Sequence, residues 1–236
     1  MSLEKNLQQI HFQIEKAAKE SGRSPREITL VAVSKMIHAE KIRQAFALEV
    51  NDFAENYTQE ALAKQESLSD LKLNWHFIGQ LQSNKVKQVV NRFTLIHSVD
   101  RLKVANEISQ RAQNPQKILL EVSLVGEKSK SGCAASELSK LIEQVQKLKN
   151  LQLLGLMFMP PLGLNLPEQE RYFSAARDIR DKAMNQVNLP HSLIELSMGT
   201  SHDFQAAIRF GATLVRLGTI LFGERQRTNM KSGSSL

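Results

Sequence analysis

Short apolar runs alternate with stretches of helical spacing along almost the whole chain. The first run, residues 28–34, is rich in β-branched residues and lacks polar alternation, which is typical of a strand buried on both faces of a parallel sheet. The pattern predicts eight strands, at residues 28–34, 51–54, 74–78, 93–97, 117–124, 151–157, 193–196 and 213–217. It predicts helices at residues 2–21, 39–48, 59–67, 84–90, 101–113, 135–148, 167–187 and 203–210.

Nearly every predicted strand is followed by a predicted helix. Eight such units in 236 residues match an α/β fold of the (β/α)8 TIM-barrel type, for which ~250 residues is typical. A doubly wound open sheet has the same alternation, and periodicity alone does not separate the two. We expect the barrel because eight is its defining number of strands. No Gly/Ser-rich linker divides the pattern, so we expect a single domain over residues 1–227, with its N-terminal helix covering the bottom of the barrel, and a disordered tail over residues 228–236.

Composition narrows the class of protein. At 42% hydrophobic and 23% charged residues the chain can bury a sizeable core, which excludes intrinsic disorder. The single cysteine, Cys133, excludes an intramolecular disulfide and fits a reducing compartment. The chain has no apolar run of membrane-spanning length and no signal-peptide pattern, so we expect a cytoplasmic protein without a membrane partner. The formal charge of +7 suggests a nucleic acid or another anion as ligand.

The loops after the seventh and eighth predicted strands are small and polar. A barrel places its functional site at the carboxyl ends of its strands, often with a phosphate bound by these two loops. Ser201 or Asp203 can cap the helix that follows the seventh strand, and the free N–H groups of that helix would form an anion site. Gly218 and Thr219 form a second turn that lets the backbone approach a phosphate closely. Either loop alone is typical of an ordinary turn, but together they predict a phosphate site.

Lys35 directly follows the first, almost wholly apolar strand. A lysine that is desolvated in a barrel mouth has a lowered pKa and can act as a nucleophile that forms a Schiff base, although many strand-end lysines only extend to water. A nucleophilic lysine beside a phosphate site is what pyridoxal 5′-phosphate (PLP) requires. Arg216, at the end of the eighth strand, would keep the pyridine nitrogen of PLP unprotonated and weaken its action as an electron sink. A structural ion pair is the alternative role for Arg216.

Seven motifs in order along the chain resemble the YggS-type pyridoxal phosphate homeostasis proteins, also called the proline synthetase co-transcribed homologue family. The motifs span residues 30–35 (LVAVSK), 53–57 (FAENY), 75–85 (WHFIGQLQSNK), 129–132 (SKSG), 155–157 (GLM), 196–201 (LSMGTS) and 215–219 (VRLGT). The resemblance therefore covers nearly the whole chain. Departures from the family pattern are Ala54, where glycine is usual, and Thr200 and His202 in the seventh loop.

The resemblance implies a barrel like the N-terminal domain of alanine racemase, with PLP held as a Schiff base on Lys35. It also implies that Arg216 faces the pyridine nitrogen, that Ser197, Gly218 and Thr219 hold the phosphate, and that Asn56 and His76 line the site. The full set of implied cofactor-binding residues is Lys35, Asn56, His76, Ser197, Met198, Gly199, Thr200, Arg216, Gly218 and Thr219.

A racemase of this kind needs a second base, which resembles a tyrosine supplied by a further domain and a partner subunit. The predicted barrel ends near residue 225, and the chain has only two tyrosines, Tyr57 and Tyr172. We therefore expect a monomeric PLP carrier that acts in PLP homeostasis, with little or no turnover and transient contacts with PLP-dependent apo-enzymes. The alternatives are an amino-acid racemase that uses Lys35 with another acid, such as His76, and a nucleic-acid-binding protein, for which no recognition motif is present.

Two further expectations concern anions and metals. Lys130 follows the fifth strand, where it could help phosphate enter or leave the barrel mouth, although residues 126–131 lack the spacing of a nucleotide-binding loop. The six histidines show no metal-ligand spacing, so we expect no metal site.

Overall fold

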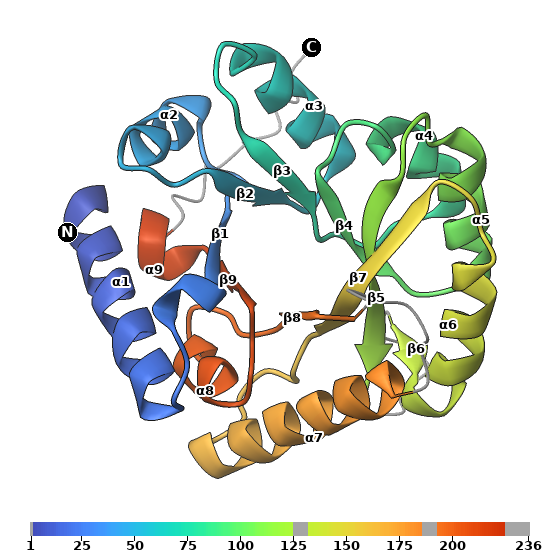
Figure 1. Cartoon of the computed structure of the whole chain (residues 1–236). Helices are drawn as coiled ribbons and strands as arrows, with labels where there is room; N and C mark the ends of the chain where they lie inside the picture. The colour runs from blue at the N-terminus through green and yellow to red at the C-terminus, as the bar shows by residue number, and fades with distance from the viewer. Residues whose placement is uncertain (1, 125–131, 186–192, 225–236) are drawn as a thin grey trace, which may run out of the picture.

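The computed structural model is a closed barrel of parallel strands surrounded by helices (Figure 1). The order around the barrel is β4-β3-β2-β1-β9-β8-β7-β5, and pairing of β4 with β5 closes the ring. The predicted (β/α)8 barrel is therefore confirmed, and the open-sheet alternative is wrong. The structure describes residues 2–124, 132–185 and 193–224, so Lys130 and the predicted tail at 228–236 lie outside the described residues.

Eight strands form the barrel, and a ninth, very short strand pairs with the carboxyl end of β5. The barrel strands are β1 (Thr29–Val33), β2 (Asp52–Glu55), β3 (Asn74–Phe77), β4 (Leu95–Val99), β5 (Gln116–Ser123), β7 (Leu151–Phe158), β8 (Glu195–Ser197) and β9 (Leu214–Leu217). The additional strand is β6 (Cys133–Ala134), which sequence periodicity did not predict.

The helices form the outer layer and connect successive strands. The α-helices are α1 (Leu3–Glu20), α2 (Ala39–Ala47), α3 (Thr58–Ser67), α4 (Val86–Val89), α5 (Leu102–Arg111), α6 (Leu138–Gln146), α7 (Leu166–Met184), α8 (Phe204–Arg209) and α9 (Thr219–Phe222). Single 3-10 turns are η1 (Pro25–Glu27), η2 (Ser83–Lys85) and η3 (Ala135–Glu137). Among the helices of the described residues, none has the length and apolarity needed to cross a bilayer.

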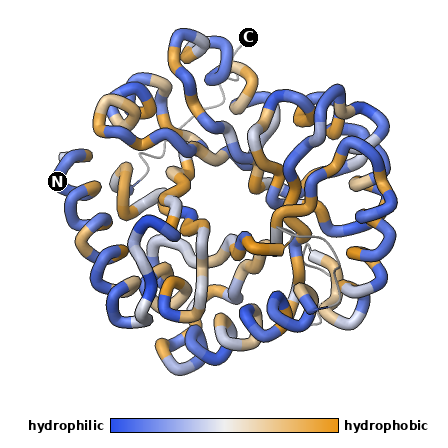
Figure 2. Tube along the Cα trace, viewed as in Figure 1, coloured by the Kyte–Doolittle hydropathy of each residue, from blue (hydrophilic) through white to orange (hydrophobic). Residues whose placement is uncertain are grey.

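Alternate strand residues face the barrel interior and the helices, which produces two separate buried clusters. The inner cluster consists of Val31, Val33, Ala54, Ile78, Leu95, Leu119, Met157 and Leu214. The larger outer cluster packs the strands against the helices and includes Ile10 of α1, Phe53 of β2 and Phe173 of α7. Figure 2 shows hydrophobic residues along the strands and hydrophilic residues on the outer turns of the helices.

The predicted element boundaries differ from the observed ones where local geometry ends a pattern early. The helix predicted at 84–90 is a 3-10 turn followed by one α-helical turn, because Val90 is extended (φ −59°, ψ 141°) and Asn91 has a positive φ of 63°. The strand predicted at 193–196 lies one to two residues later, since Leu193 has a positive φ of 60° and the ladder includes Ser197. Gly218 and Thr219, predicted as a turn, begin the helical turn α9.

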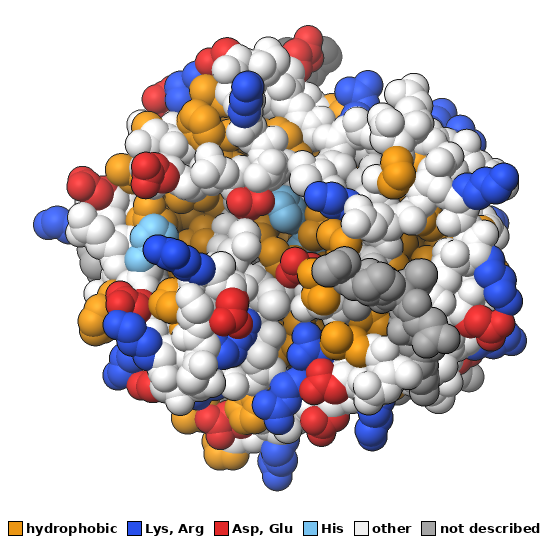
Figure 3. Space-filling model, in the orientation of Figure 1, with side chains coloured by type: hydrophobic (Ala, Val, Ile, Leu, Met, Phe, Trp, Pro, Cys, Tyr) orange, Lys and Arg blue, Asp and Glu red, His pale blue; other side chains and the backbone are white. Residues whose placement is uncertain are grey.

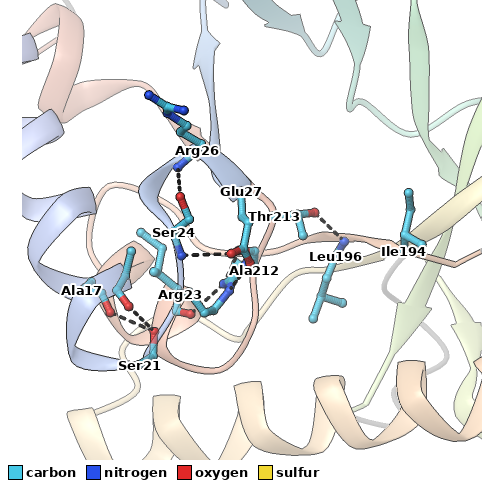
Figure 4. Close-up of polar contacts among 12 residues, drawn as sticks. Ala17, Ser21, Arg23, Ser24, Arg26, Glu27, Ile194, Leu196, Ala212 and Thr213 are labelled. Atoms are coloured by element: carbon cyan, nitrogen blue, oxygen red, sulfur yellow. Dashed lines mark hydrogen bonds and ion pairs between the residues drawn. The ribbon is translucent and has the colours of Figure 1, made fainter.

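A hydrogen-bonded corner fixes the start of β1 (Figure 4). Ser24 and Glu27 cap each other around η1, with the Ser24 N–H donating to Glu27 Oε1 at 2.9 Å. Arg23 donates from Nη1 to the carbonyl oxygens of Ile208 and Ala212 at 3.0 and 2.8 Å. These bonds join the connection between α1 and β1 to the end of α8, so the strand that leads to Lys35 has a fixed origin.

Replacing Arg23 by Ala should lower the free energy of unfolding by about 2 kcal/mol, because two charge-assisted hydrogen bonds, to the carbonyls of Ile208 and Ala212, are lost. Lys19→Ala, which removes an exposed ion pair with Glu15, should cost less than about 0.5 kcal/mol. Urea unfolding of both variants measures the difference. Equal losses of unfolding free energy in the two variants would show that the hydrogen bonds of Arg23 do not stabilise the barrel.

Candidate functional site

The carboxyl ends of the strands surround a cavity of about 160 Å³. The cavity is lined by Val33, Lys35, Asn56, Ile78, Met159, Thr200, Ser201, His202, Arg216, Gly218 and Thr219. Six of the ten predicted cofactor-binding residues therefore come together here. Larger hollows lie elsewhere on the surface, but this one combines a lysine, an arginine and two glycine-containing loops at the end of a barrel where such sites form.

Lys35 reaches this cavity because it continues the inward-facing series of β1. Val31 and Val33 belong to the inner cluster, and Lys35 is two residues further along the same face. The side chain is half-buried, and it follows Ser34, which is fully buried. In register across the sheet, Val31 pairs with Arg216, which brings the lysine and the arginine to the same side of the mouth.

Arg216 is 2% exposed and carries a buried positive charge. Its Nη1 donates to Ser197 Oγ at 2.7 Å, and its Nη2 donates to the Phe158 carbonyl at 2.9 Å. Burial lowers the pKa of Arg216 to about 10, while the carboxylates of Asp203 and Glu121 oppose that shift, so the guanidinium remains protonated at neutral pH. Only Nε of Arg216 has no hydrogen-bond partner within the described residues.

A second cavity-lining residue also has a buried polar atom without a partner in the described chain. Asn56 follows β2, and its Oδ1 accepts no hydrogen bond there. Gly79 packs directly behind it, since a Cβ on Gly79 would lie 1.9 Å from the Asn56 carbonyl oxygen. Buried polar groups nearly always have partners, so one free donor on Arg216 and one free acceptor on Asn56 mark the position of a polar ligand.

Backbone N–H groups converge on one hydroxyl at the other end of the cavity. The N–H groups of Gly218 and Ile220 each lie 3.3 Å from Ser201 Oγ, at the start of α9. These N–H groups at the first turn of α9, with the Ser201 hydroxyl to which they donate and the nearby Thr219, form a suitable environment for an anion.

Asp203, expected as a possible cap of α8 beside an anion site, makes no such cap. Asp203 Oδ1 accepts hydrogen bonds from the N–H and Oγ1 of Thr200, at 2.5 and 3.0 Å, and makes no side-chain cap to α8. Gly199 has a positive φ of 91°, and a Cβ there would lie 2.7 Å from the Ala207 side chain. Met198 is fully buried. Met198 and Gly199 pack the loop after β8 against the core, and neither residue lines the cavity.

Ser197 and His76 lie beneath the cavity, inside the barrel. Ser197 was predicted to hold the phosphate, but it is fully buried and its Oγ contacts Arg216 Nη1 and His97 Nδ1, the latter at 2.9 Å. His76 Nδ1 lies 2.9 Å from His97 Nε2, and His76 Nε2 lies 3.0 Å from Asp52 Oδ1. The ladder of β8 extends to Ser197, so its side chain points into the barrel and does not line the cavity.

A single chain of hydrogen bonds thus crosses the barrel from Arg216 to Asp52. Arginine has only donors, so Ser197 accepts from it and can donate its own proton to His97 Nδ1. His97 then donates from Nε2 to His76, and His76 donates from Nε2 to the Asp52 carboxylate, which satisfies every member. Burial and the neighbouring charges of His76 and Arg216 lower the pKa of His97 well below its usual value, so a neutral His97 fits this direction.

The two tyrosines are unsuited to act as a base in the cavity. The Tyr172 hydroxyl donates to the Met159 carbonyl at 2.9 Å, and burial raises the pKa of this phenol far above neutral pH. Tyr57 precedes α3 and is 61% exposed, and it is not among the residues that line the cavity. Burial likewise raises the pKa of the Cys133 thiol to about 12. Within the described ranges, no cluster of three or more His, Cys, Asp or Glu side chains could hold a metal ion.

Comparison with known proteins agrees with this architecture. The family model of the alanine racemase N-terminal domain matches residues 6–226. An alanine racemase from Clostridium difficile has the same fold, with a TM-score of 0.71 and 16% identity over 94% of this chain and 56% of that chain. The barrel and its mouth thus define a protein of the alanine racemase N-terminal-domain class.

Proteins with higher sequence identity place the chain in a narrower family within this class. A pyridoxal phosphate homeostasis protein from Pseudomonas aeruginosa is 44% identical over 95% of this chain and 96% of its own length, and one from Escherichia coli K12 is 41% identical over 93% and 95%. PipY of Synechococcus elongatus, solved with PLP bound, has a TM-score of 0.80 and 38% identity, covering 89% of this chain and 100% of that one. The chain belongs to the family of pyridoxal phosphate homeostasis proteins, so the resemblance found in the sequence is confirmed.

The neutral state of His97 makes stability depend on pH. Its folded-state pKa is depressed and its unfolded-state pKa is near 6.5, so the unfolded chain takes up a proton first as the pH falls. The contribution of His97 is fully present above pH 6.5 and is lost at lower pH, by up to about 1.4 kcal/mol per pH unit. His97→Gln should therefore lose less stability than the wild type between pH 6.5 and 5.5.

Urea unfolding at three pH values across this range measures the slopes. His11→Gln, on the exposed face of α1, is the matched control and should keep the wild-type slope. If the slope for His97→Gln equals that of the wild type, His97 is not the neutral residue described above.

Proposed function

We propose that this protein binds PLP at the barrel mouth, holds it as a Schiff base on Lys35 and acts in PLP homeostasis as a carrier that stores and delivers the cofactor. One observation carries the proposal: Lys35 shares its cavity with a buried arginine whose only unpaired donor, within the described residues, is Nε. The names of its relatives, pyridoxal phosphate homeostasis proteins, and the PLP bound in PipY support it.

Each part of the cavity has a distinct task in this proposal. Lys35 would hold the cofactor as a Schiff base, formed when its neutral Nζ displaces the carbonyl oxygen of the aldehyde as water. Arg216 Nε would donate to the pyridine nitrogen, and Asn56 Oδ1 would accept from a polar group of the ring. Ser201, with the N–H groups of Gly218 and Ile220, holds the phosphate, which replaces the role first expected of Ser197.

The same residues favour storage over turnover. PLP supplies an electron sink for carbanion chemistry, and that sink is strongest when its ring nitrogen is protonated. A guanidinium at that nitrogen disfavours its protonation because two positive charges would then be adjacent. Racemisation also needs a second base, but the Tyr172 hydroxyl is hydrogen-bonded to Met159 and both ring nitrogens of His76 are occupied beneath the cavity.

The face shown in Figure 3 gives no support to the nucleic-acid alternative. On it, Lys and Arg side chains are interspersed with Asp and Glu around the rim, and the centre shows hydrophobic side chains together with acidic and histidine side chains. A nucleic-acid interface would instead gather basic residues along one stripe or patch. The formal charge of +7 is therefore assigned to a general preference for anions, of which a phosphorylated cofactor is one.

The proposal is tested by adding PLP to the purified protein and recording its absorbance. We expect a band at about 410–430 nm that is lost on borohydride reduction and does not form in Lys35→Ala. Lys41→Ala, another lysine at this end of the barrel, is the matched control and should retain the band. A wild-type protein that gains no band, or a Lys35→Ala variant that gains it, would sink the proposal.

The proposal assigns the phosphate to Ser201 rather than to Ser197. Ser201→Ala removes a hydroxyl from the phosphate end, so PLP should bind about tenfold more weakly, the effect of losing one charge-assisted hydrogen bond of about 1.5 kcal/mol. Pyridoxal, which lacks the phosphate, should bind Ser201→Ala and the wild type equally. Titration of both ligands by absorbance measures this. A Ser201→Ala variant that weakens both ligands alike would contradict the assignment.

A further inference from the structure

A buried ion-pair network lies beneath the loop that carries Lys35. Lys64 of α3 is 7% exposed, and its ammonium donates to the Ser34 carbonyl at 2.6 Å, to Glu55 Oε1 at 2.7 Å and to Glu60 Oε1 at 2.6 Å. An ammonium has three N–H donors, so all three are used. The network joins the end of β1, the end of β2 and the first turns of α3 at one nitrogen atom.

The network holds the main chain on both sides of Lys35. Lys64 binds the carbonyl of Ser34, the residue before it, and Glu60 Oε1 accepts from the Met36 N–H, the residue after it, at 2.5 Å. Met36 has a positive φ of 61° and is 60% exposed. An unbranched residue that is not glycine adopts this conformation at a cost, so the turn needs support from its surroundings. Glu60 supplies that support.

Glu55 completes the network from below. It is fully buried, and its Oε1 accepts from Lys64 Nζ and from Ser34 Oγ, both at 2.7 Å. Burial raises the pKa of this carboxyl, while Lys64 and Ser34 favour the charged form and Glu60 disfavours it. Its Oε2 has no partner in the described chain. A buried ion pair of this kind contributes little to stability compared with an apolar core, but it specifies one geometry.

We propose that Lys64 and Glu60 are positioning residues that fix the backbone on either side of Lys35, so that its Nζ meets the aldehyde of PLP at bonding distance. This inference rests on the proposed function, since it requires Lys35 to be the residue that bonds the aldehyde. Lys64 itself takes no part in bond formation, because its ammonium has no free donor and is held away from the cavity by three acceptors. Two lysines near the barrel mouth thus have separate tasks.

The experiment compares the rate of bond formation with the binding of an analogue that cannot form the bond. Glu60→Ala removes the acceptor for the Met36 N–H, so the absorbance band at about 410–430 nm should develop about tenfold more slowly after PLP is added, the scale of a small misplacement of a reacting group. Pyridoxine 5′-phosphate, which has an alcohol in place of the aldehyde, should bind with its affinity changed by less than about twofold because the phosphate end is intact.

Two further variants control for structure and charge. Glu60→Gln keeps an oxygen for the Met36 N–H and should restore most of the rate. Glu143→Ala breaks the exposed Glu143–Lys147 pair of α6, which has the same spacing of four residues, and should leave both readouts unchanged. A Glu60→Ala rate equal to that of the wild type overturns the inference, as does a loss of pyridoxine 5′-phosphate binding that parallels the loss of rate.

A measurement on the wild-type protein covers the case in which a variant does not fold. Hydrogen exchange of the Met36 amide without ligand should be slow despite the exposure of that residue, because its N–H donates a hydrogen bond to Glu60 Oε1. Exchange as fast as that of the exposed, unstructured amides of the chain overturns the inference. If the wild type gains no band with PLP, the proposed function fails, whereas a normal band in Glu60→Ala at the wild-type rate rejects only the positioning role.

Discussion

The burial of one positive charge determines much of the barrel interior. Arg216 projects inward from β9 and is almost inaccessible to water, so its guanidinium requires acceptors within the barrel. Ser197 of β8 and the carbonyl of Phe158 at the end of β7 provide them. Ser197 is in turn connected through His97 and His76 to Asp52. Residues of five strands are thus placed with reference to one cation, and only its Nε is left, within the described chain, for a ligand.

The barrel separates two kinds of polar environment along its axis. Beneath the mouth, His97, His76 and Ser197 relay hydrogen bonds between elements that are far apart in sequence. Around the mouth, the charged network of Lys64 shapes the turn after β1, and the first turn of α9 presents N–H groups. The apolar inner cluster lies among them and keeps water from competing for these groups. Lys35 lies at this boundary, where the Lys64 network holds its backbone and its side chain lines the cavity.

The barrel could be predicted from the sequence because it depends on a local pattern of repeated strand–helix units. The position of Lys35 and Arg216 at the barrel mouth could be predicted because both are charged residues at the ends of apolar runs. The inward position of Ser197 was not predicted, because the expected strand ends at Leu196, one residue before the observed end of β8. The partners of Ser197 could not be predicted, since His97 lies 100 positions away. Lys64 was missed because a lysine in a helix is usually exposed, and only the folded structure brings Ser34 and Glu55 beneath it.

The main chain behind the cavity is closely packed. Gly79 fits against the Asn56 carbonyl, and Gly199 fits against α8, with no room for a side chain in either place. A ligand therefore meets a shape that is already set, and little of its binding free energy is spent on ordering the protein. For the carrier proposed above, this has a kinetic consequence. The residence time of a covalently held aldehyde would be set by the making and breaking of one bond, and hence by the amines that compete for it, rather than by the slow opening of a segment.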